Sequence, residues 1–221
     1  MTRSSTGPIL AVMATSNPAK LEHPVVAALY DAYMWPRELM GFRRQRRRMA
    51  DEATGRVLEL AAGTGLGFPF YTRAQEVVAI DPDPAMLKRA RRRVVNAPCP
   101  VRLLQADAES LPFADAEFDT ILIAFGLCTI PHPEDALREA RQVLKPDNHL
   151  LFLEHVRSTG RRHARLQDLA APAWRRLTGG CNPNRPSLET IEREFEIDRL
   201  WRKGIIVQGS AKAPASAPPR R

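Results

Sequence analysis

The strongest constraint on the fold is a regular alternation of apolar and amphipathic segments along the chain. The apolar segments are short, apolar on both faces and bounded by turn residues, which favours strands; they are Arg56–Leu60, Val77–Ile80, Val101–Gln105, Phe118–Phe125 and His149–Val156. Pro84–Val94 and Pro133–Leu144 repeat apolar residues every three or four positions, which predicts helices. Strands that alternate with helices indicate a mainly parallel sheet with helices on both faces, so we predict an α/β fold.

Composition and turn residues divide the rest of the chain. The first residues are rich in Ser, Thr and Pro, and the last ones in Ala, Pro and Ser, as in flexible segments. Pro36 interrupts a stretch with helical spacing, which predicts two helices. Two segments near the end of the chain favour an antiparallel hairpin. The predicted parts are a flexible N-terminus at 1–18, lid helices at 19–55, the α/β domain at 56–212 with a helical lid insert at 164–195 and the hairpin Glu196–Arg202 and Ile205–Ala211, and a disordered tail at 213–221.

The length of the apolar runs and the number of cysteines limit the class of protein. No apolar run approaches the roughly 18 residues that a membrane-spanning helix needs. The three cysteines, Cys99, Cys128 and Cys181, are widely spaced and odd in number. This pattern is typical of reduced thiols rather than of a disulfide framework or a zinc site. We therefore expect a cytoplasmic protein.

The net charge of +8 comes from two arginine-rich runs, Arg43–Arg48 and Lys88–Arg93. We interpret both as solvated helix faces, because no aromatic residues are interleaved with them as nucleic-acid stacking would require. No nucleic-acid partner is therefore expected. The first run follows Leu39 and Phe42 and precedes Met49, which suggests a helix that packs these apolar residues over a ligand cleft. Its arginines would then face solvent and could contact the periphery of an anionic membrane.

A glycine-containing turn follows the first predicted strand. It reads Glu59-Leu60-Ala61-Ala62-Gly63-Thr64-Gly65, and its glycines allow the backbone to approach a ligand closely. A doubly wound sheet binds its ligand outside the carboxyl ends of its strands. Asp81 ends the second strand, where a carboxylate can accept ribose hydroxyl hydrogens, and Asp107 ends the third. The turn lacks the G-x-G-x-x-G spacing of dinucleotide sites, which favours an adenosyl ligand without a pyrophosphate.

These motifs resemble those of class I S-adenosylmethionine-dependent methyltransferases, in particular the group with the quinone-biosynthesis enzymes. The resemblance runs from about Leu58 to Val156. It implies a Rossmann-like sheet of seven strands, S-adenosyl-L-methionine as cofactor, and methyl transfer to a small-molecule or lipid acceptor. It also implies the cofactor-binding residues: Glu59, Ala61, Gly63, Thr64 and Gly65 at the methionine end, Asp81 at the ribose, Met86 near the adenine, Asp107 and Ala108 at its edge, and Ala124 beside the cofactor.

A narrower likeness concerns the alkyl-thiol methyltransferase-like branch. It rests on Phe68–Tyr71, Leu127–Thr129, Leu153–Val156, Pro172–Trp174 and Gly180–Asn182. The accepting atom stays open between a thiol, a quinone-like acceptor and an amine. One departure is Asp147-Asn148, which replaces the usual Gly-Gly turn; asparagine can adopt the left-handed torsions that such a turn needs.

Two histidines lie where a catalytic base could act. His155 ends the fifth predicted strand and His132 follows the fourth. Either imidazole could accept a substrate proton near neutral pH, with a structural role as the alternative for both. No metal-binding cluster is expected from the spacing of the cysteines and histidines.

Two other functions are compatible with parts of the pattern. A nicotinamide-dependent (NAD) oxidoreductase would also use a glycine-rich turn after the first strand, but the dinucleotide spacing and a substrate domain are missing. A non-catalytic adenosyl-binding or nucleic-acid-binding module is suggested only by the arginine runs. The sequence therefore favours a methyltransferase.

Overall fold

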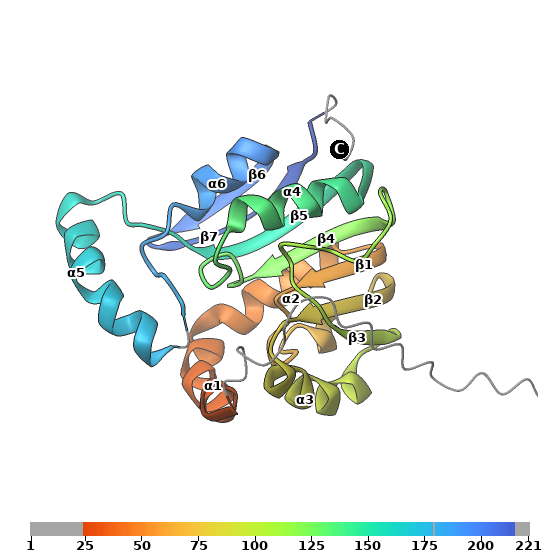
Figure 1. Cartoon of the computed structure of the whole chain (residues 1–221), viewed down its shortest axis with the longest axis horizontal. Coiled ribbons are helices and arrows are strands. Elements are labelled where there is room, and N and C mark those ends of the chain that lie inside the picture. Colours follow the sequence, from red (N-terminus) through yellow and green to blue (C-terminus); the bar gives the residue numbers. More distant parts are fainter. Residues whose placement is uncertain (1–23, 179, 215–221) are drawn as a thin grey trace, which may run out of the picture.

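Seven strands form one sheet, in the order β3-β2-β1-β4-β5-β7-β6, in the computed structural model, which describes residues 24–178 and 180–214 (Figure 1). β1 to β5 pair in parallel, whereas β7 runs antiparallel to both β5 and β6. The predicted α/β class with a seven-stranded, mainly parallel Rossmann-like sheet is confirmed. The strands are β1 Gly55–Leu60, β2 Ala74–Asp81, β3 Val101–Gln105, β4 Phe118–Ala124, β5 Leu144–His155, β6 Glu196–Lys203 and β7 Ile206–Lys212.

Helices cover both faces of this sheet, because the strands are apolar on both sides. On one face, α4 (Pro133–Val143) and α6 (Ser187–Glu194) share a core with alternate strand residues such as Leu58. On the other face, α2 (Arg43–Glu52) and α3 (Pro84–Arg93) pack on the intervening residues such as Val57. Successive strand residues point to opposite faces, so neighbours in sequence belong to different cores.

The N-terminal helices do not divide at the predicted position. Pro36 lies inside the last turn of α1 (Pro24–Arg37), where a missing backbone N–H removes only one helical hydrogen bond. The break falls at Gly41, whose φ of 127° lies outside the helical range, within a short π-helical segment, η2 (Glu38–Phe42). The predicted break at Pro36 is therefore wrong, and Gly41 is the residue at which the chain turns from α1 into α2.

One long helix of the predicted lid insert contacts neighbouring loops and α1 rather than the sheet. α5 (Arg161–Leu177) buries only two alanines, Ala164 and Ala171, and lies away from the sheet, at the left of Figure 1. Two short 3₁₀ segments complete the described elements, η3 (Phe68–Phe70) and η4 (Val94–Asn96). The predicted N-terminus at 1–18 and most of the predicted tail at 213–221 lie outside the described residues.

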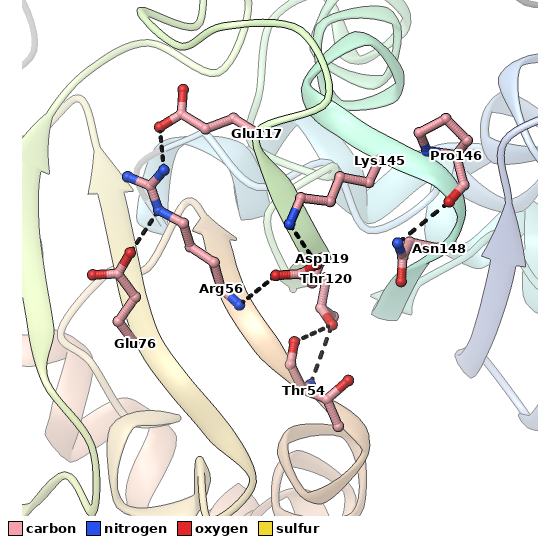
Figure 2. A network of polar contacts seen from close by, with 9 residues as sticks. All are labelled: Thr54, Arg56, Glu76, Glu117, Asp119, Thr120, Lys145, Pro146 and Asn148. Atoms are coloured by element: carbon pink, nitrogen blue, oxygen red, sulfur yellow. Dashed lines mark hydrogen bonds and ion pairs between the residues drawn. The ribbon is translucent and has the colours of Figure 1, made fainter.

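The amino ends of the central strands are joined by a polar network (Figure 2). Asp119 of β4 accepts hydrogen bonds from the backbone N–H of Arg56 at 2.9 Å and from Lys145 Nζ at 2.7 Å. The Arg56 guanidinium pairs with Glu76 and Glu117, at 2.6 and 2.7 Å. β1, β2, β4 and β5 are thus held together at the edge opposite the carboxyl ends of the parallel strands.

The turn at Asp147-Asn148 lies inside β5 and also differs in detail from the prediction. Asp147, rather than Asn148, adopts the left-handed conformation, with φ of 60°. The Asn148 side-chain amide instead donates a hydrogen bond to the carbonyl of Pro146 at 3.3 Å. β5 is extended from Leu144, which pairs with Phe118, so the strand starts earlier than the predicted His149.

Candidate active site

The loop after β1 forms one wall of the site. Ala61, Gly63 and Gly65 have positive φ angles of 51°, 56° and 75°, a region that side chains disfavour. A Cβ atom on Gly63 would meet nothing within 4 Å, whereas one on Gly65 would lie 2.5 Å from the ring of Phe68. Gly63 therefore borders open space, and Gly65 is required by packing.

Asp81, at the carboxyl end of β2, is fixed by backbone donors. Its Oδ2 accepts the N–H of Gly63 at 2.8 Å, and its Oδ1 accepts the N–H of Asp83 at 2.9 Å. Burial raises the pKa of Asp81 to about 6, although these two hydrogen bonds lower it in part. The loop after β1 and the end of β2 are thereby locked together around one carboxylate.

A second buried carboxylate, Glu59, lies at the end of β1. Burial raises its pKa to about 7, against the lowering effects of the Tyr71 hydroxyl and of Arg46. Its Oε2 is buried and has no hydrogen-bond partner among the described residues. Buried polar atoms are nearly always paired in folded proteins, so this oxygen is available to a ligand.

Arg46 corrects the interpretation of the first arginine run. It is only 5% exposed, and its Nε donates to Glu38 Oε1 at 2.9 Å. Its guanidinium also lies 5.2 Å from the ring centroid of Phe125. The run is therefore not wholly a solvated face, because one of its members turns inward. Of the apolar residues expected over the cleft, Met49 is buried and Phe42 stacks on Phe125, but Leu39 is 69% exposed.

These residues surround a cavity of about 230 Å³ at the carboxyl ends of the parallel strands. Gly65 is the one predicted cofactor residue that does not line it. The rest of the cavity wall comes from α1, from the loop after β4 and from Thr178, with Tyr30, Phe125, Thr129 and Ile130 in the lining. The predicted residues in the lining are Glu59, Ala61, Gly63, Thr64, Asp81, Met86, Asp107, Ala108 and Ala124.

α1 is fastened to the glycine turn by one polar cluster. Thr64 Oγ1 donates to Asp31 Oδ1 at 2.7 Å, and Arg93 donates both to Asp31 Oδ2 at 2.9 Å and to the Thr64 carbonyl at 2.7 Å. Arg93 belongs to the second arginine run, which is therefore also not a purely solvated face. The cluster holds the N-terminal helix over the cavity.

The two predicted catalytic histidines lie in different surroundings. His132 is exposed, pairs with Glu109 at 2.9 Å and does not line the cavity. The hydrogen bond to Glu109 raises its pKa. His155 lies behind the cavity wall, with its ring centroid 4.7 Å from that of Phe125, and its Nδ1 is buried without a hydrogen-bond partner.

His155 is brought together with two of the cysteines. Its ligand atom and the sulfurs of Cys128 and Cys181 all lie within 4.8 Å of one another, and the two sulfurs are 3.4 Å apart. The pKa of Cys181 is lowered, first by its interaction with Cys128 and then by those with His155 and Trp174. Sequence reasoning missed this cluster, because its members come from three segments that only the folded sheet and the insert bring into contact.

Comparison with known proteins identifies the family. Residues 58–152 match a family model described as a methyltransferase domain. The ubiquinone/menaquinone biosynthesis C-methyltransferase UbiE of Pseudomonas savastanoi pv. phaseolicola is 39% identical over 205 residues, which cover 79% of each chain. The chain belongs to the class I S-adenosylmethionine-dependent methyltransferases. The enzyme therefore uses S-adenosylmethionine as cofactor, and the oxidoreductase alternative is set aside.

Solved structures share the fold of this methyltransferase. The YcgJ protein of Bacillus subtilis aligns with a TM-score of 0.61 at 22% identity, covering 72% of both chains. The DhpI–SAH complex aligns with a TM-score of 0.65 at 19% identity, covering 87% of this chain and 94% of that one. At these identities the likeness concerns the fold.

Three independent observations indicate that the cavity can hold S-adenosylmethionine. Gly63 leaves open space where a Cβ would otherwise project. Glu59 presents a buried oxygen without a partner. Asp81 is aligned by two backbone N–H groups at the end of β2, the position from which a carboxylate can receive ribose hydroxyls.

Proposed function

We propose that this methyltransferase transfers the methyl group to an apolar small-molecule or lipid acceptor by in-line displacement. The observation that carries the proposal is the composition of the cavity. Besides the predicted cofactor residues, the lining includes the apolar residues Phe125, Ile130 and Pro131 together with Val26 of α1. A cavity lined by polar cofactor residues and by apolar side chains suits a mainly apolar acceptor.

The proposed roles of the cofactor residues follow the family resemblance. Glu59, Ala61, Gly63 and Thr64 would hold the methionine end, with Gly65 supporting the turn from below. Asp81 would hold the ribose, and Met86, Asp107 and Ala108 the adenine. Ala124 would lie beside the cofactor, where its small side chain leaves room.

The reaction would depend mainly on positioning. S-adenosylmethionine supplies a methyl group on a positively charged sulfur, which is already a good leaving group. The protein must then hold the acceptor atom in line, and such positioning can contribute roughly 7–11 kcal/mol. His132 is exposed and faces Glu109, so we do not assign it a role in the transfer. We place His155 in the part of the site where the acceptor would bind.

A lipid surface is the proposed source of the acceptor. Large apolar side chains are exposed on α1, which lines the cavity, on η2, which follows α1, and on α5, which ends next to Thr178 of the cavity wall: Val25, Leu29, Trp35, Leu39, Met40, Leu166, Leu169 and Leu177. α5 also carries basic residues at both ends. Helices with exposed apolar and basic residues bind at the surface of anionic bilayers. None of the described helices has the length and hydropathy needed to span a bilayer.

The decisive experiment is an acceptor screen that measures release of S-adenosylhomocysteine. Purified enzyme is incubated with S-adenosylmethionine and with matched long-chain and short-chain thiols, quinols and amines, with Asp81→Ala as a control whose cofactor binding is weakened. We expect turnover with at least one long-chain acceptor and weak turnover with its short-chain partner. Equal turnover of both, or turnover only with polar acceptors, would contradict an apolar acceptor.

A further inference from the structure

Three segments of the chain direct soft ligand atoms to one point behind the cavity wall. Cys128 lies in the loop after β4, His155 ends β5, and Cys181 follows α5. The three ligand atoms lie within 4.8 Å of one another, and the sulfurs are 3.4 Å apart. Two thiols and one imidazole at this spacing form the ligand set that zinc prefers.

The surrounding polar contacts hold both cysteines in place. The carbonyl of Cys128 accepts hydrogen bonds from the backbone N–H and the side-chain amide of Asn182, at 2.8 and 3.2 Å. Arg185 donates to the carbonyls of Leu127 and Ile130, on either side of Cys128. The segment that carries Cys181 is thereby fixed against the loop that carries Cys128, so the two sulfurs are positioned before any ligand arrives.

The loop that carries Cys128 is also anchored by the buried carboxylate of Glu154. Glu154 Oε1 accepts the N–H groups of Gly126 and Leu127, at 2.8 and 2.9 Å. The same strand presents His155 as its next residue, so one short segment positions both the loop and the imidazole. Nδ1 of His155 is buried without a hydrogen-bond partner. A buried ring nitrogen without a partner is uncommon in a folded protein. The imidazole offers one of its two ring nitrogens to the cluster.

We propose that Cys128, His155 and Cys181 bind one zinc-class divalent cation, with a fourth coordination position left for a small ligand. Within residues 24–178 and 180–214, no further histidine, cysteine or carboxylate joins the cluster. Zinc sites with three protein ligands keep the fourth position for water or substrate. Binding replaces the thiol protons, which pass to solvent, so the ion carries two thiolates and a neutral imidazole.

The location of the cluster indicates what the fourth ligand would be. Phe125 and Thr129 flank Cys128 in the chain and line the cavity, as does Thr178 near Cys181. The open position therefore lies next to the acceptor side of the site. This step rests on the proposed function. A thiol acceptor would bind the ion as a thiolate, because a coordinating thiol loses its proton, and it would reach the methyl donor already as a nucleophile.

Metal binding is tested first, without reference to turnover. The reduced, metal-free protein is titrated with Co²⁺, which reports thiolate ligands through a charge-transfer absorption band, and with Zn²⁺ in competition. We expect one ion per chain and a thiolate-to-cobalt band. Cys128→Ser, Cys181→Ser and His155→Ala should each weaken binding at least about 100-fold, above the range for changes to residues that only support a ligand.

Cys99→Ser is the matched control, because Cys99 is a free cysteine outside the cluster. It should leave the cobalt band unchanged. Circular dichroism and calorimetry with S-adenosylmethionine establish that each variant is folded. If the reduced wild type binds no ion, or if Cys99→Ser loses the band, the metal site is refuted. A Cys128–Cys181 disulfide that forms in air, with no metal bound after reduction, would also refute it.

The fourth position is tested by adding acceptors to the cobalt protein. A small thiol should shift the band, and a quinol of similar size should not. An unchanged spectrum with every thiol would overturn the open position. These results are independent of turnover: a protein that binds cobalt and S-adenosylmethionine but methylates nothing refutes the proposed function alone.

Discussion

Two buried carboxylates at neighbouring strand ends line the cavity. Asp81 and Glu59 are 7% and 3% exposed, and burial raises the pKa of both. Backbone N–H groups fix Asp81, whereas one oxygen of Glu59 has no partner. A preorganised carboxylate and an unpaired one have different consequences when a ligand binds: the first aligns hydroxyl donors, and the second gains a partner that it lacks.

Asp81→Ala should weaken binding of S-adenosylmethionine by roughly 1–3 kcal/mol, the cost of unpairing hydrogen-bonded polar groups. The variant would lose the proposed acceptor for the ribose hydroxyls, and it also frees the N–H of Gly63. Isothermal calorimetry measures the loss, and circular dichroism verifies the fold. Thr72→Ala, which removes a surface hydrogen bond to Asp51, serves as control. Equal affinities of wild type and Asp81→Ala would remove Asp81 from the binding site.

Cofactor affinity should also fall on acidification. The pKa values of about 6 for Asp81 and about 7 for Glu59 mean that both take up protons just below neutral pH. If the ligand binds the ionised carboxylates, each must lose its proton first, so affinity decreases as pH falls through these values. Calorimetry between about pH 5 and pH 8, in buffers with different ionisation enthalpies, reports the protons released. Affinity that is constant over this range would mean that neither carboxylate binds in ionised form.

Sequence reasoning located Glu59, Asp81 and Asp107 in the cavity, because they lie at or just after predicted strand ends. It missed Tyr30 and the inward position of Arg46. The charge pattern could not single out Arg46 among its neighbours. Its burial depends on Glu38, which is brought near by the π-helical segment, and on Phe125, which lies in a loop 79 residues later. Such contacts depend on tertiary structure, not on local periodicity.

At the level of elements, the order of the strands and helices was predictable from apolar periodicity, but the turns and breaks between them were not. Gly41 rather than Pro36 is where the N-terminal helices break, and Asp147 rather than Asn148 takes the left-handed torsion in the turn within β5. Both are single torsions, which sequence pattern constrains weakly. The polar network of Figure 2 was not predicted either, since its members come from four strands or the turns beside them.

Asp119→Asn should destabilise this network. Partial burial would raise the Asp119 pKa, but the hydrogen bonds from Lys145 and Arg56 outweigh it and lower the pKa below 3.8. A lowered carboxyl pKa in the folded state stabilises the protein above the unfolded value, and this contribution disappears as pH falls through the folded value. The variant should lose about 1 kcal/mol at neutral pH, reduced by solvent screening, or about 2–4 °C in Tm.

Thermal unfolding at neutral and acidic pH tests this prediction. The difference between wild type and Asp119→Asn should begin to shrink below about pH 4 and should vanish only below the lowered pKa of folded Asp119, where both proteins carry a neutral side chain. Glu192→Gln, an exposed carboxylate on α6, is the charge-matched control and should show little change at either pH. A difference that persists undiminished in acid would show that the loss has another cause.

Over the whole molecule, apolar and basic side chains gather on the elements beside the cavity. α1, η2 and α5 expose large apolar residues, and α2 exposes Arg43, Arg44, Arg47 and Arg48. Arg46 is excluded, because it is buried and paired with Glu38. A surface that combines both kinds of side chain beside an apolar cavity would bring the mouth of the cavity to a lipid headgroup layer. The acceptor could then enter without crossing water.

Replacing the four exposed α2 arginines with glutamine should therefore abolish salt-sensitive binding to anionic vesicles while S-adenosylmethionine affinity is kept. Each basic residue near an acidic bilayer contributes about 1 kcal/mol, and added salt screens this attraction. Vesicle sedimentation of wild type and variant at low and high salt measures the effect. The control removes the same charge from exposed sites on other elements: Arg102, Arg138, Arg193 and Lys212. Equal losses of vesicle binding in both variants would indicate an effect of net charge alone. If the wild type stays in the supernatant at low salt, the α2 arginines do not bind membranes and only face solvent.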